Sequence, residues 1–185
     1  MPRIVAGSAK GRHLAVPAKG TRPTSDRARE ALFSSLASMV DLHGARVLDL
    51  FAGTGAVGLE ALSRGAAQVT FVESDRAAAE VLKHNIAAVA LAGTALLRCT
   101  AESFVIAAGA EAPFRLAFAD PPYALRDAAL AAILAALDDP RWLEPGAIVV
   151  VERAARSAEP QWPDGVAPVK QRRYGEGVLW YGRRR

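Results

Sequence analysis

The sequence predicts an α/β fold in which a mostly parallel β-sheet ends in an antiparallel hairpin. Three observations support this prediction. From Arg46 onward, short apolar segments alternate with helical ones, as expected for buried parallel strands covered by helices on both faces. A glycine-rich turn follows the first apolar segment. After Arg156 the pattern changes to two strands joined by a tight turn. The length of 185 residues fits a single domain.

The residues before the alternating region form a basic N-terminal extension. Residues 3–16 are expected to be a hairpin of short strands around Gly7 and Gly11. Residues 28–40 are expected to be a helix, because a polar run rich in capping residues precedes their apolar periodicity. We therefore expect residues 1–40 to pack as an extension on a main domain of residues 41–185.

The alternating region supplies five parallel strands and four helices, and the C-terminal residues add two strands, giving seven in all. Each predicted strand is a short apolar run, and each predicted helix is a longer stretch, often rich in alanine. The strands are expected at residues 46–51, 68–73, 95–99, 115–120, 147–152, 166–174 and 178–183, and the helices at 57–64, 76–91, 102–108 and 127–137.

Positive charge is concentrated at the two ends of the chain. The formal net charge is +4, but residues 1–29 carry +6, residues 170–185 carry +5, and the part between is acidic. Such a distribution favours a polyanionic partner held by the ends, although basic termini can also serve solubility alone. The N-terminal candidates for RNA binding are Lys10, Arg12, Lys19, Arg22, Arg27 and Arg29.

Composition argues against several other classes of protein. The longest apolar run, residues 128–137, is far shorter than the roughly 20 residues that span a bilayer, and the first residues do not resemble a secretory signal. Cys99 is the only cysteine, which fits a reducing cytoplasm. His13, His43 and His84 are scattered without the spacing of a metal site. We therefore expect a cytoplasmic protein without a metal.

The glycine-rich turn has the pattern of a nucleotide-binding loop. Gly53, Gly55 and Gly58 follow a predicted strand and open a helix, so the backbone can approach a ligand closely. Glu73 ends the next strand, near the separation at which an acid binds ribose hydroxyls. The pattern fits NAD as well as S-adenosylmethionine, and the loop residues Phe51, Ala52, Gly53 and Gly55 are candidate cofactor ligands in either case.

Asp49 favours S-adenosylmethionine over NAD. A carboxylate inside the first strand is costly to bury unless a partner compensates it. In methyltransferases an acid at this position lies near the methionine end of the cofactor. The alternative is a structural role, in which Asp49 only fixes the glycine turn.

The segment Asp120-Pro121-Pro122-Tyr123 points to methylation of an amino group. It follows a predicted strand, at the sheet edge where ligands bind in such folds. An exocyclic amine is a poor nucleophile, because its lone pair is delocalised into the ring. Asp120 and the Pro121 carbonyl can each accept one N–H and so favour a pyramidal nitrogen, while the prolines fix the backbone.

The remaining features of this segment fit a base that leaves its helix. Tyr123 offers a ring on which an unpaired or flipped-out base can stack. The methyl donor is an activated sulfonium, so alignment contributes most of the acceleration and no strong general base is required. Glu102 follows the third strand, where it can border the adenine of the cofactor or simply be an acid in the first turn of a helix.

Together these segments resemble the bacterial 16S rRNA guanine-N2 methyltransferase family, which belongs to the Rossmann-like class I methyltransferases. The resemblance runs from residues 3–7 through the Arg-Pro-Thr helix start at residues 22–33, the glycine loop and residues 120–123 to the turn at Tyr174. It implies a guanine target in the head of the 30S subunit, S-adenosylmethionine as the cofactor, and the ligands named above. Ser34 and residues 100–102 depart from the family pattern, and the second departure puts the Glu102 contact in question.

Other functions remain open from the sequence. A nicotinamide-dependent oxidoreductase would use the glycine loop and Glu73 but would leave Asp49 and residues 120–123 unexplained. A catalytically inactive RNA-binding assembly factor would keep the fold but would not transfer a methyl group. Within methyltransferases, N6-adenine methylation of DNA or RNA and protein glutamine methylation are the nearest alternatives. A monomer is favoured as the oligomeric state.

Overall fold

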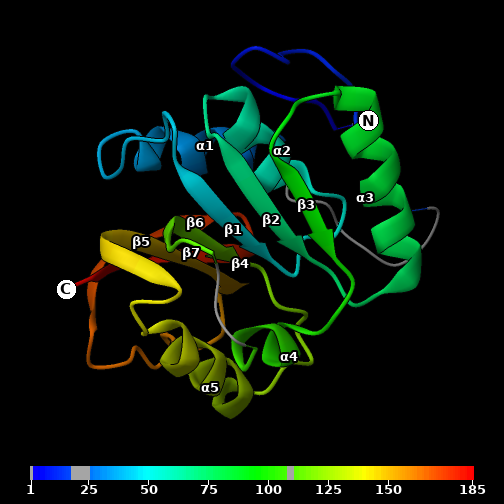
Figure 1. Ribbon diagram of the computed structural model, residues 1–185. Helices are drawn as coiled ribbons and strands as arrows, with labels where there is room; N and C mark the ends of the chain where they lie inside the picture. The colour runs from blue at the N-terminus through cyan, green and yellow to red at the C-terminus, as the bar shows by residue number, and fades with distance from the viewer. Residues whose placement is uncertain (1, 18–25, 108–110) are drawn as a thin grey trace.

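The computed structural model describes residues 2–17, 26–107 and 111–185 and contains a seven-stranded sheet of order β3-β2-β1-β4-β5-β7-β6 (Figure 1). This confirms the predicted α/β class. The helices are α1 (Asp26–Leu36), α2 (Ala56–Ser63), α3 (Arg76–Val89), α4 (Ala101–Val105) and α5 (Asp127–Leu137), and the strands are β1 (Arg46–Leu50), β2 (Gln68–Val72), β3 (Thr94–Leu97), β4 (Phe114–Ala119), β5 (Leu143–Ala154), β6 (Val166–Tyr174) and β7 (Gly177–Arg184).

The sheet reverses its direction of growth between β1 and β4. The chain builds outward from β1 through β2 to β3, then crosses back and places β4 on the other side of β1. All pairs among β1 to β5 are parallel, so the carboxyl ends of these strands share one edge. In doubly wound sheets a crevice forms at such a reversal, and ligands bind there.

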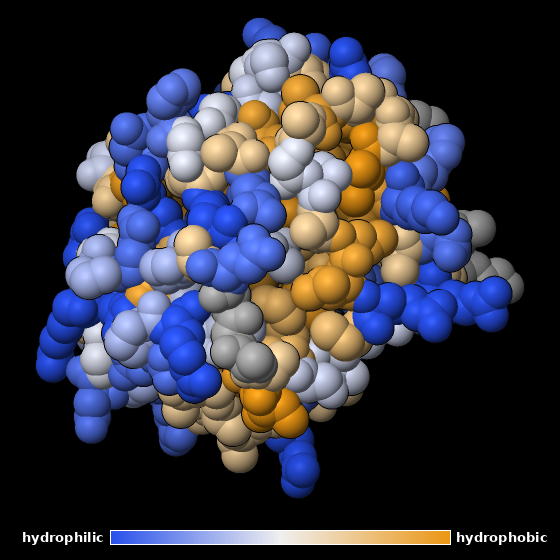
Figure 2. Space-filling view, in the orientation of Figure 1, coloured by the Kyte–Doolittle hydropathy of each residue, from blue (hydrophilic) through white to orange (hydrophobic). Residues whose placement is uncertain are grey.

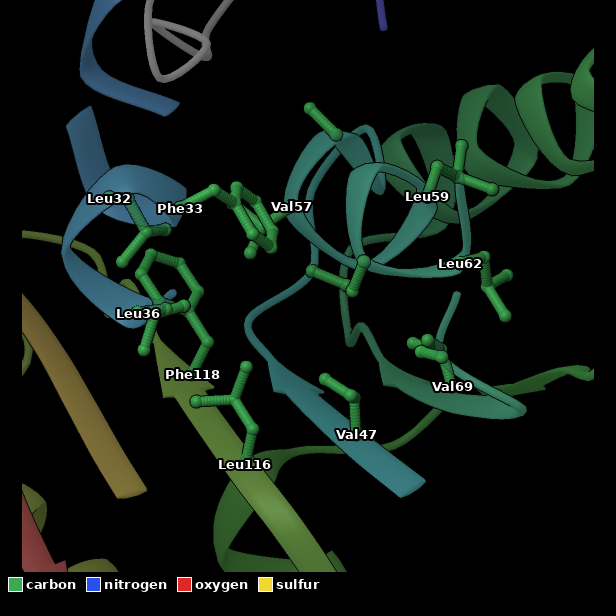
Figure 3. Packing of buried hydrophobic residues seen from close by; sticks show 14 of the residues in the cluster. Leu32, Phe33, Leu36, Val47, Val57, Leu59, Leu62, Val69, Leu116 and Phe118 are labelled. Carbon is green, nitrogen blue, oxygen red and sulfur yellow. The ribbon is translucent and has the colours of Figure 1, made fainter. Parts of the chain in front are cut away.

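Helices cover both faces of the sheet and create two apolar cores. One core lies under α1, α2 and α3, and Figure 3 shows Phe33 and Leu36 of α1 directed toward Phe118 of β4 and toward α2. The other lies under α4 and α5, where Phe104 and Trp142 stack with ring centroids 4.7 Å apart. Truncating a side chain as deeply buried as Phe118 typically costs about 3–5 kcal/mol.

The pairing of β4 with β5 contains an irregularity at the start of β5. Phe114 pairs with Leu143, but Leu116 already pairs with Ile148, so β5 holds extra residues between these two pairs. Gly146 lies in this bulge with a φ of 81°, a left-handed conformation that favours glycine. Beyond the bulge the register is regular up to the pair of Ala119 with Val151.

The predicted C-terminal hairpin is confirmed. β7 pairs antiparallel with both β5 and β6, and the turn between β6 and β7 uses Gly175 at a φ of 57°. β5 begins four residues earlier than predicted, because its bulge is still part of the strand. None of the described helices has the length and apolar character needed to cross a membrane.

The N-terminal segment is a shorter form of the predicted hairpin. One antiparallel bridge joins Arg3 and His13, and backbone hydrogen bonds on either side of it link the two arms. The backbone N–H groups of Val5 and Ala6 donate to the fully buried carboxylate of Glu60 in α2, at 2.7 and 3.0 Å. Side-chain acceptors from the main domain therefore end the hairpin ladder after its first pairs.

Candidate active site

The predicted site residues meet at the carboxyl ends of β1, β2 and β4, on both sides of the reversal. Leu50 pairs with Ala119, so the loops that start at Phe51 and Asp120 leave neighbouring strands together. The charges of Asp120 and Glu73 both act on Asp49, which shows that the three acids share one neighbourhood. Residues 49, 73 and 120 are thus brought together from three separate strands.

The glycine loop has a backbone that its sequence makes possible. Gly53 and Gly55 have φ values of 55° and 77°, and Phe51 is one of two described non-glycine residues with positive φ. A Cβ on Gly55 would lie 2.1 Å from Leu82 of α3, and one on Gly58 would lie 2.3 Å from Phe71 of β2, so α3 packs tightly against the loop and α2 against the sheet. A Cβ on Gly53 would meet only one atom, the Phe51 carbonyl oxygen at 4.0 Å. The open side of the loop is therefore at Gly53.

Asp49 fixes the start of α2. Its carboxylate accepts the Gly58 N–H at 2.9 Å, and the side chain is only 2% exposed. Burial raises the pKa of Asp49 well above its usual range, the Gly58 hydrogen bond opposes this shift, and the charges of Asp120 and Glu73 add to it. The structure thus supplies the structural role that the sequence left open. Contact between Asp49 and a cofactor stays a prediction.

Glu73 links the ends of two loops. One carboxylate oxygen accepts the Gly53 N–H at 2.7 Å, and the other accepts the Asp75 N–H, also at 2.7 Å. Asp75 in turn caps α3 by accepting the Ala78 N–H. Each oxygen of a carboxylate has two lone pairs, so Glu73 can still accept ribose hydroxyls.

These residues fit S-adenosylmethionine. The open side of Gly53 leaves room for the ligand beside the backbone, and Glu73 follows β2 next to this loop, where ribose binding stays a prediction. The acids Asp49 and Asp120 suit the positive sulfonium of this cofactor, because an opposite charge compensates their burial. No group of metal-ligating side chains occurs in the described part of the chain.

Asp120 begins the second half of the site. Burial raises the pKa of its half-buried carboxyl to about 6. Pro121 is buried, whereas Pro122 and Tyr123 are exposed, and the Tyr123 side chain is 69% accessible. The Leu125 N–H donates to the Pro122 carbonyl at 2.9 Å and closes a turn. This arrangement leaves the tyrosine ring at the surface, where a base can reach it.

Two positioning residues near the loops have no motif in the sequence. Arg153 of β5 donates to the Asp127 carboxylate at 2.7 Å and to the Leu125 carbonyl at 3.3 Å, so it braces the segment after Tyr123. Asn85 of α3 is fully buried and donates to the Thr54 carbonyl at 2.9 Å, joining the glycine loop to the N-terminal segment. The remaining bonds of Asn85 are to the backbone of Ala15, at 2.8 and 3.0 Å.

A second acid at the carboxyl edge was also missed. Glu152 of β5 is half-buried, and burial together with the charge of Asp120 raises its pKa to about 8. In the sequence it is one acid at the end of an apolar run, and nothing in its spacing relates it to Asp120. Only the pairing of β4 with β5 reveals this relation.

The structure shows which of the predicted RNA-binding residues are exposed. Arg29 is a correction: it is fully buried, and its guanidinium donates to the Arg3 carbonyl at 2.5 Å and to the Asp26 carboxylate at 2.7 Å. A guanidinium buried in this way fastens the N-terminal segment to α1 and cannot reach a phosphate. Lys10 and Arg27 are exposed, as predicted candidates should be.

The other candidates are placed differently. Arg12 is exposed, but its guanidinium donates to the carbonyls of Ala88 and Val89 at the end of α3, where a cation is favourable. Lys19 and Arg22 lie outside the described residues. Glu102 is exposed in the first turn of α4, and its contact with adenine stays a prediction.

The outer strands border the site with contrasting surfaces. Figure 2 shows hydrophobic residues gathered in the middle of the viewed face, where Figure 1 places β3, and Leu97 at the end of β3 is 42% exposed. On the opposite outer strand, β6, Arg172 and Arg173 are exposed. The site therefore lies between an apolar flank and a basic flank.

Comparison with known proteins agrees with this geometry. A family described as conserved hypothetical protein 95 matches residues 2–183. Ribosomal RNA small subunit methyltransferase D of Escherichia coli is 40% identical over 162 residues, covering 87% of this chain and 79% of the relative. The putative rRNA methyltransferase YlbH of Bacillus subtilis is 37% identical, covering 98% of this chain and 99% of the relative.

A solved structure gives the same result. The putative methyltransferase yhhF from Escherichia coli superposes with a TM-score of 0.86 at 37% identity, covering 98% of this chain and 97% of that one. Sequence and structural similarity therefore both extend over nearly the whole chain, including both halves of the site. The chain belongs to the conserved hypothetical protein 95 family and is an S-adenosylmethionine-dependent methyltransferase.

Proposed function

We propose that the protein transfers a methyl group to the N2 amino group of one guanine in 16S rRNA, within the assembled or assembling 30S subunit. The observation that carries this proposal is the position of residues 120–123. They follow β4 at the reversal of the sheet, next to the acids at the ends of β1 and β2, where they would accept the amine. Relatives whose names specify small-subunit rRNA methylation support the RNA substrate.

The cofactor half of the site holds the donor. Glu73 would accept the ribose hydroxyls, the loop at Phe51 to Gly55 would follow the methionine portion, and Glu102 would border the adenine. When bound, S-adenosylmethionine supplies an activated methyl group next to Asp49 and Asp120. Protein groups hold the loop in shape: Glu73 and Asp49 accept the N–H groups of Gly53 and Gly58, and the Ala52 carbonyl accepts that of Gly55.

The substrate half prepares the amine. Asp120 accepts one N–H of the guanine amino group, and the Pro121 carbonyl accepts the other. This directs the nitrogen lone pair toward the methyl carbon. Transfer of the methyl group would leave S-adenosylhomocysteine as the second product and would require the nitrogen to lose one proton. Asp120 has a pKa of about 6, so it is mostly ionised at neutral pH and can receive that proton.

The exposed position of Tyr123 suits the entry of the target base into the substrate half of the site. Tyr123 is at the surface and offers a stacking face for a guanine that has left its helix. Lys10 and Arg27 on the N-terminal side and Arg172 and Arg173 on β6 would contact phosphates around the site. We place this activity in the cytoplasm, where ribosomal subunits are assembled, and we expect a monomer that uses no metal.

The proposal is tested by nucleoside mass spectrometry of 16S rRNA from cells that have or lack the gene. N2-methylguanosine at one position should disappear without the gene and return when the wild-type protein is supplied. An Asp120→Asn variant should not restore it. Unchanged N2-methylguanosine, or loss of N6-methyladenosine in its place, would contradict the proposal.

A further inference from the structure

Glu152 lies beside Asp120 in a row of residues along the carboxyl edge. Ala119 pairs with Val151 on parallel strands, so Asp120 and Glu152 follow as neighbours. Glu152 also pairs with Leu179 of β7, and Leu179 pairs with Arg172 of β6. Adjacent strands are about 4.8 Å apart, so Glu152 is one strand from Asp120 and Arg172 is two strands from Glu152.

One oxygen of the Glu152 carboxyl has no hydrogen-bond partner in the described part of the chain. This Oε2 atom is buried, and the buried hydroxyl of Tyr174 in β6 likewise has no partner among the described residues. The Oε1 atom of Glu152 lies where a Cβ on Gly177 would be only 3.2 Å away, so glycine at this position keeps that oxygen uncrowded. A buried carboxyl oxygen that no protein group satisfies is costly, and such groups cluster at functional sites.

We propose that Glu152 contacts the target base and determines the preference for guanine, by accepting its N1–H while Asp120 accepts an N2–H. This inference rests on the function proposed above. Guanine presents N1–H and N2–H donors side by side, which matches two adjacent carboxyls. Adenine presents a bare N1 acceptor beside its amino group, which an ionised Glu152 would repel.

The protonation of Glu152 gives the contact a pH dependence. Among the described residues, titratable groups on the same face as Glu152 include Asp120 on β4, Tyr181 on β7 and, one strand further, Tyr174 and Arg172 on β6. With a pKa of about 8, Glu152 carries a proton at neutral pH, and its carbonyl oxygen still accepts N1–H. The protonated form can also donate to a bare N1. Discrimination against a base without N1–H should therefore grow as the pH rises and Glu152 ionises.

The experiment uses 2-aminopurine at the target position, in small subunits reconstituted with ligated 16S RNA. This base keeps the N2 amino group but has no hydrogen on N1. The ratio of kcat/KM for guanine to that for 2-aminopurine is measured from pH 6.5 to 9. The proteins are wild type, Glu152→Gln and Glu144→Gln. Glu144 is a matched control, because it lies on the same strand at the opposite edge and pairs with Arg115.

In the wild-type protein and Glu144→Gln, the ratio should be small near pH 6.5, rise as Glu152 ionises around pH 8, and favour guanine by about tenfold or more at pH 9. In Glu152→Gln it should be several-fold smaller than this at pH 9 and independent of pH, since an amide can either accept N1–H or donate to N1. Retained affinity for S-adenosylhomocysteine shows that this variant is folded. A Glu152→Gln ratio equal to wild type at every pH would overturn the inference. Failure of the wild-type protein to methylate guanine N2 would instead refute the proposed function.

Discussion

The two halves of the site differ in how their acids are satisfied. In the cofactor half, the carboxylates of Asp49 and Glu73 accept three backbone N–H groups at 2.7 to 2.9 Å. Burial raises the pKa of Asp49, but the Gly58 hydrogen bond opposes that shift. In the substrate half, no hydrogen bond from the described part of the chain opposes the rise of the pKa values of Asp120 and Glu152 to about 6 and about 8. One oxygen of Glu152 also has no partner among the described residues. The first half is held in shape by the fold, whereas the second is left to be completed by a base.

The largest expected effect separates the two halves by function. Asp120→Ala and Asp120→Asn should lower kcat by about 10²–10³-fold, because the amine loses its charged acceptor in the transition state. The dissociation constant of S-adenosylhomocysteine should stay within a few-fold of wild type, as measured by calorimetry. Near-normal turnover by Asp120→Ala would show that the substrate half has been assigned to the wrong residue.

A complementary change affects the cofactor half. Glu73→Ala should weaken binding of S-adenosylhomocysteine by about 1.5–3 kcal/mol, the usual range for hydrogen bonds to a charged group. It should also lower stability, because the N–H groups of Gly53 and Asp75 lose their acceptor. Asp75→Ala is the control: it removes the cap of α3, costs about 1 kcal/mol of stability, and should leave cofactor affinity unchanged. Equal affinities in Glu73→Ala and wild type would exclude Glu73 as the ribose ligand.

The difference between the two halves also predicts that the Asp120 carboxylate, which serves the reaction, lowers the stability of the fold. The pKa of Asp120 is raised from 3.8 to about 6 in the folded protein, so its ionisation above pH 6 costs stability. The unfolding free energy of the cofactor-free protein should therefore fall between about pH 4 and 7. Asp120→Asn should remove part of this fall and be more stable than wild type at pH 8, on the order of 2 kcal/mol in urea titrations.

A surface acid tests the sign of this effect. Asp139 has a pKa lowered to about 2 by its hydrogen bonds with Arg141, so Asp139→Asn should not stabilise the protein at pH 8. If Asp120→Asn behaved like Asp139→Asn, the carboxyl of Asp120 would be well solvated in the folded protein. The statement that the acids of the substrate half are less well satisfied than those of the cofactor half would then be wrong for Asp120.

The smallest expected effects concern the basic residues that would contact RNA phosphates on either side of the site. Replacing Lys10 or Arg173 with Ala should each flatten the dependence of log affinity on log salt by about 0.7–0.9, the value for one phosphate contact. Arg12 is unsuitable for this test, because it also binds the end of α3. Cofactor affinity is the internal control and should not change. A slope unchanged in both variants would mean that the phosphates are held elsewhere.

Much of the fold follows from local pattern. All seven strands, the antiparallel ending and the glycine loop were predictable, because buried strands and left-handed turns leave signatures within a few residues. The predicted hairpin at residues 3–16 is shorter than expected for a non-local reason: the N–H groups of Val5 and Ala6 are taken by Glu60, more than 50 residues away. The RNA-binding prediction for Arg29 was wrong for a similar reason, since nothing in a basic, polar segment shows that one arginine is buried under the chain before it.

The site shows the same division. Asp120 and Tyr123 belong to a contiguous motif and could be assigned from the sequence. Asn85 and Glu152 act through partners on other elements, so their positions depend on helix packing and strand register. Sequence alone also left two roles open for Asp49, and the Gly58 hydrogen bond shows one of them.

The bulge at the start of β5 has a consequence for how such a site can change during evolution. The extra residues around Gly146 lie about 20 Å along the strand from the residue beside Asp120. A one-residue slip of β5 would turn every one of its buried side chains to the other face, so the two cores hold the register. A one-residue deletion in the bulge would therefore shorten the bulge and leave Glu152 beside Asp120. The bulge thus allows the length of this segment to change without changing the chemistry at the opposite edge of the sheet.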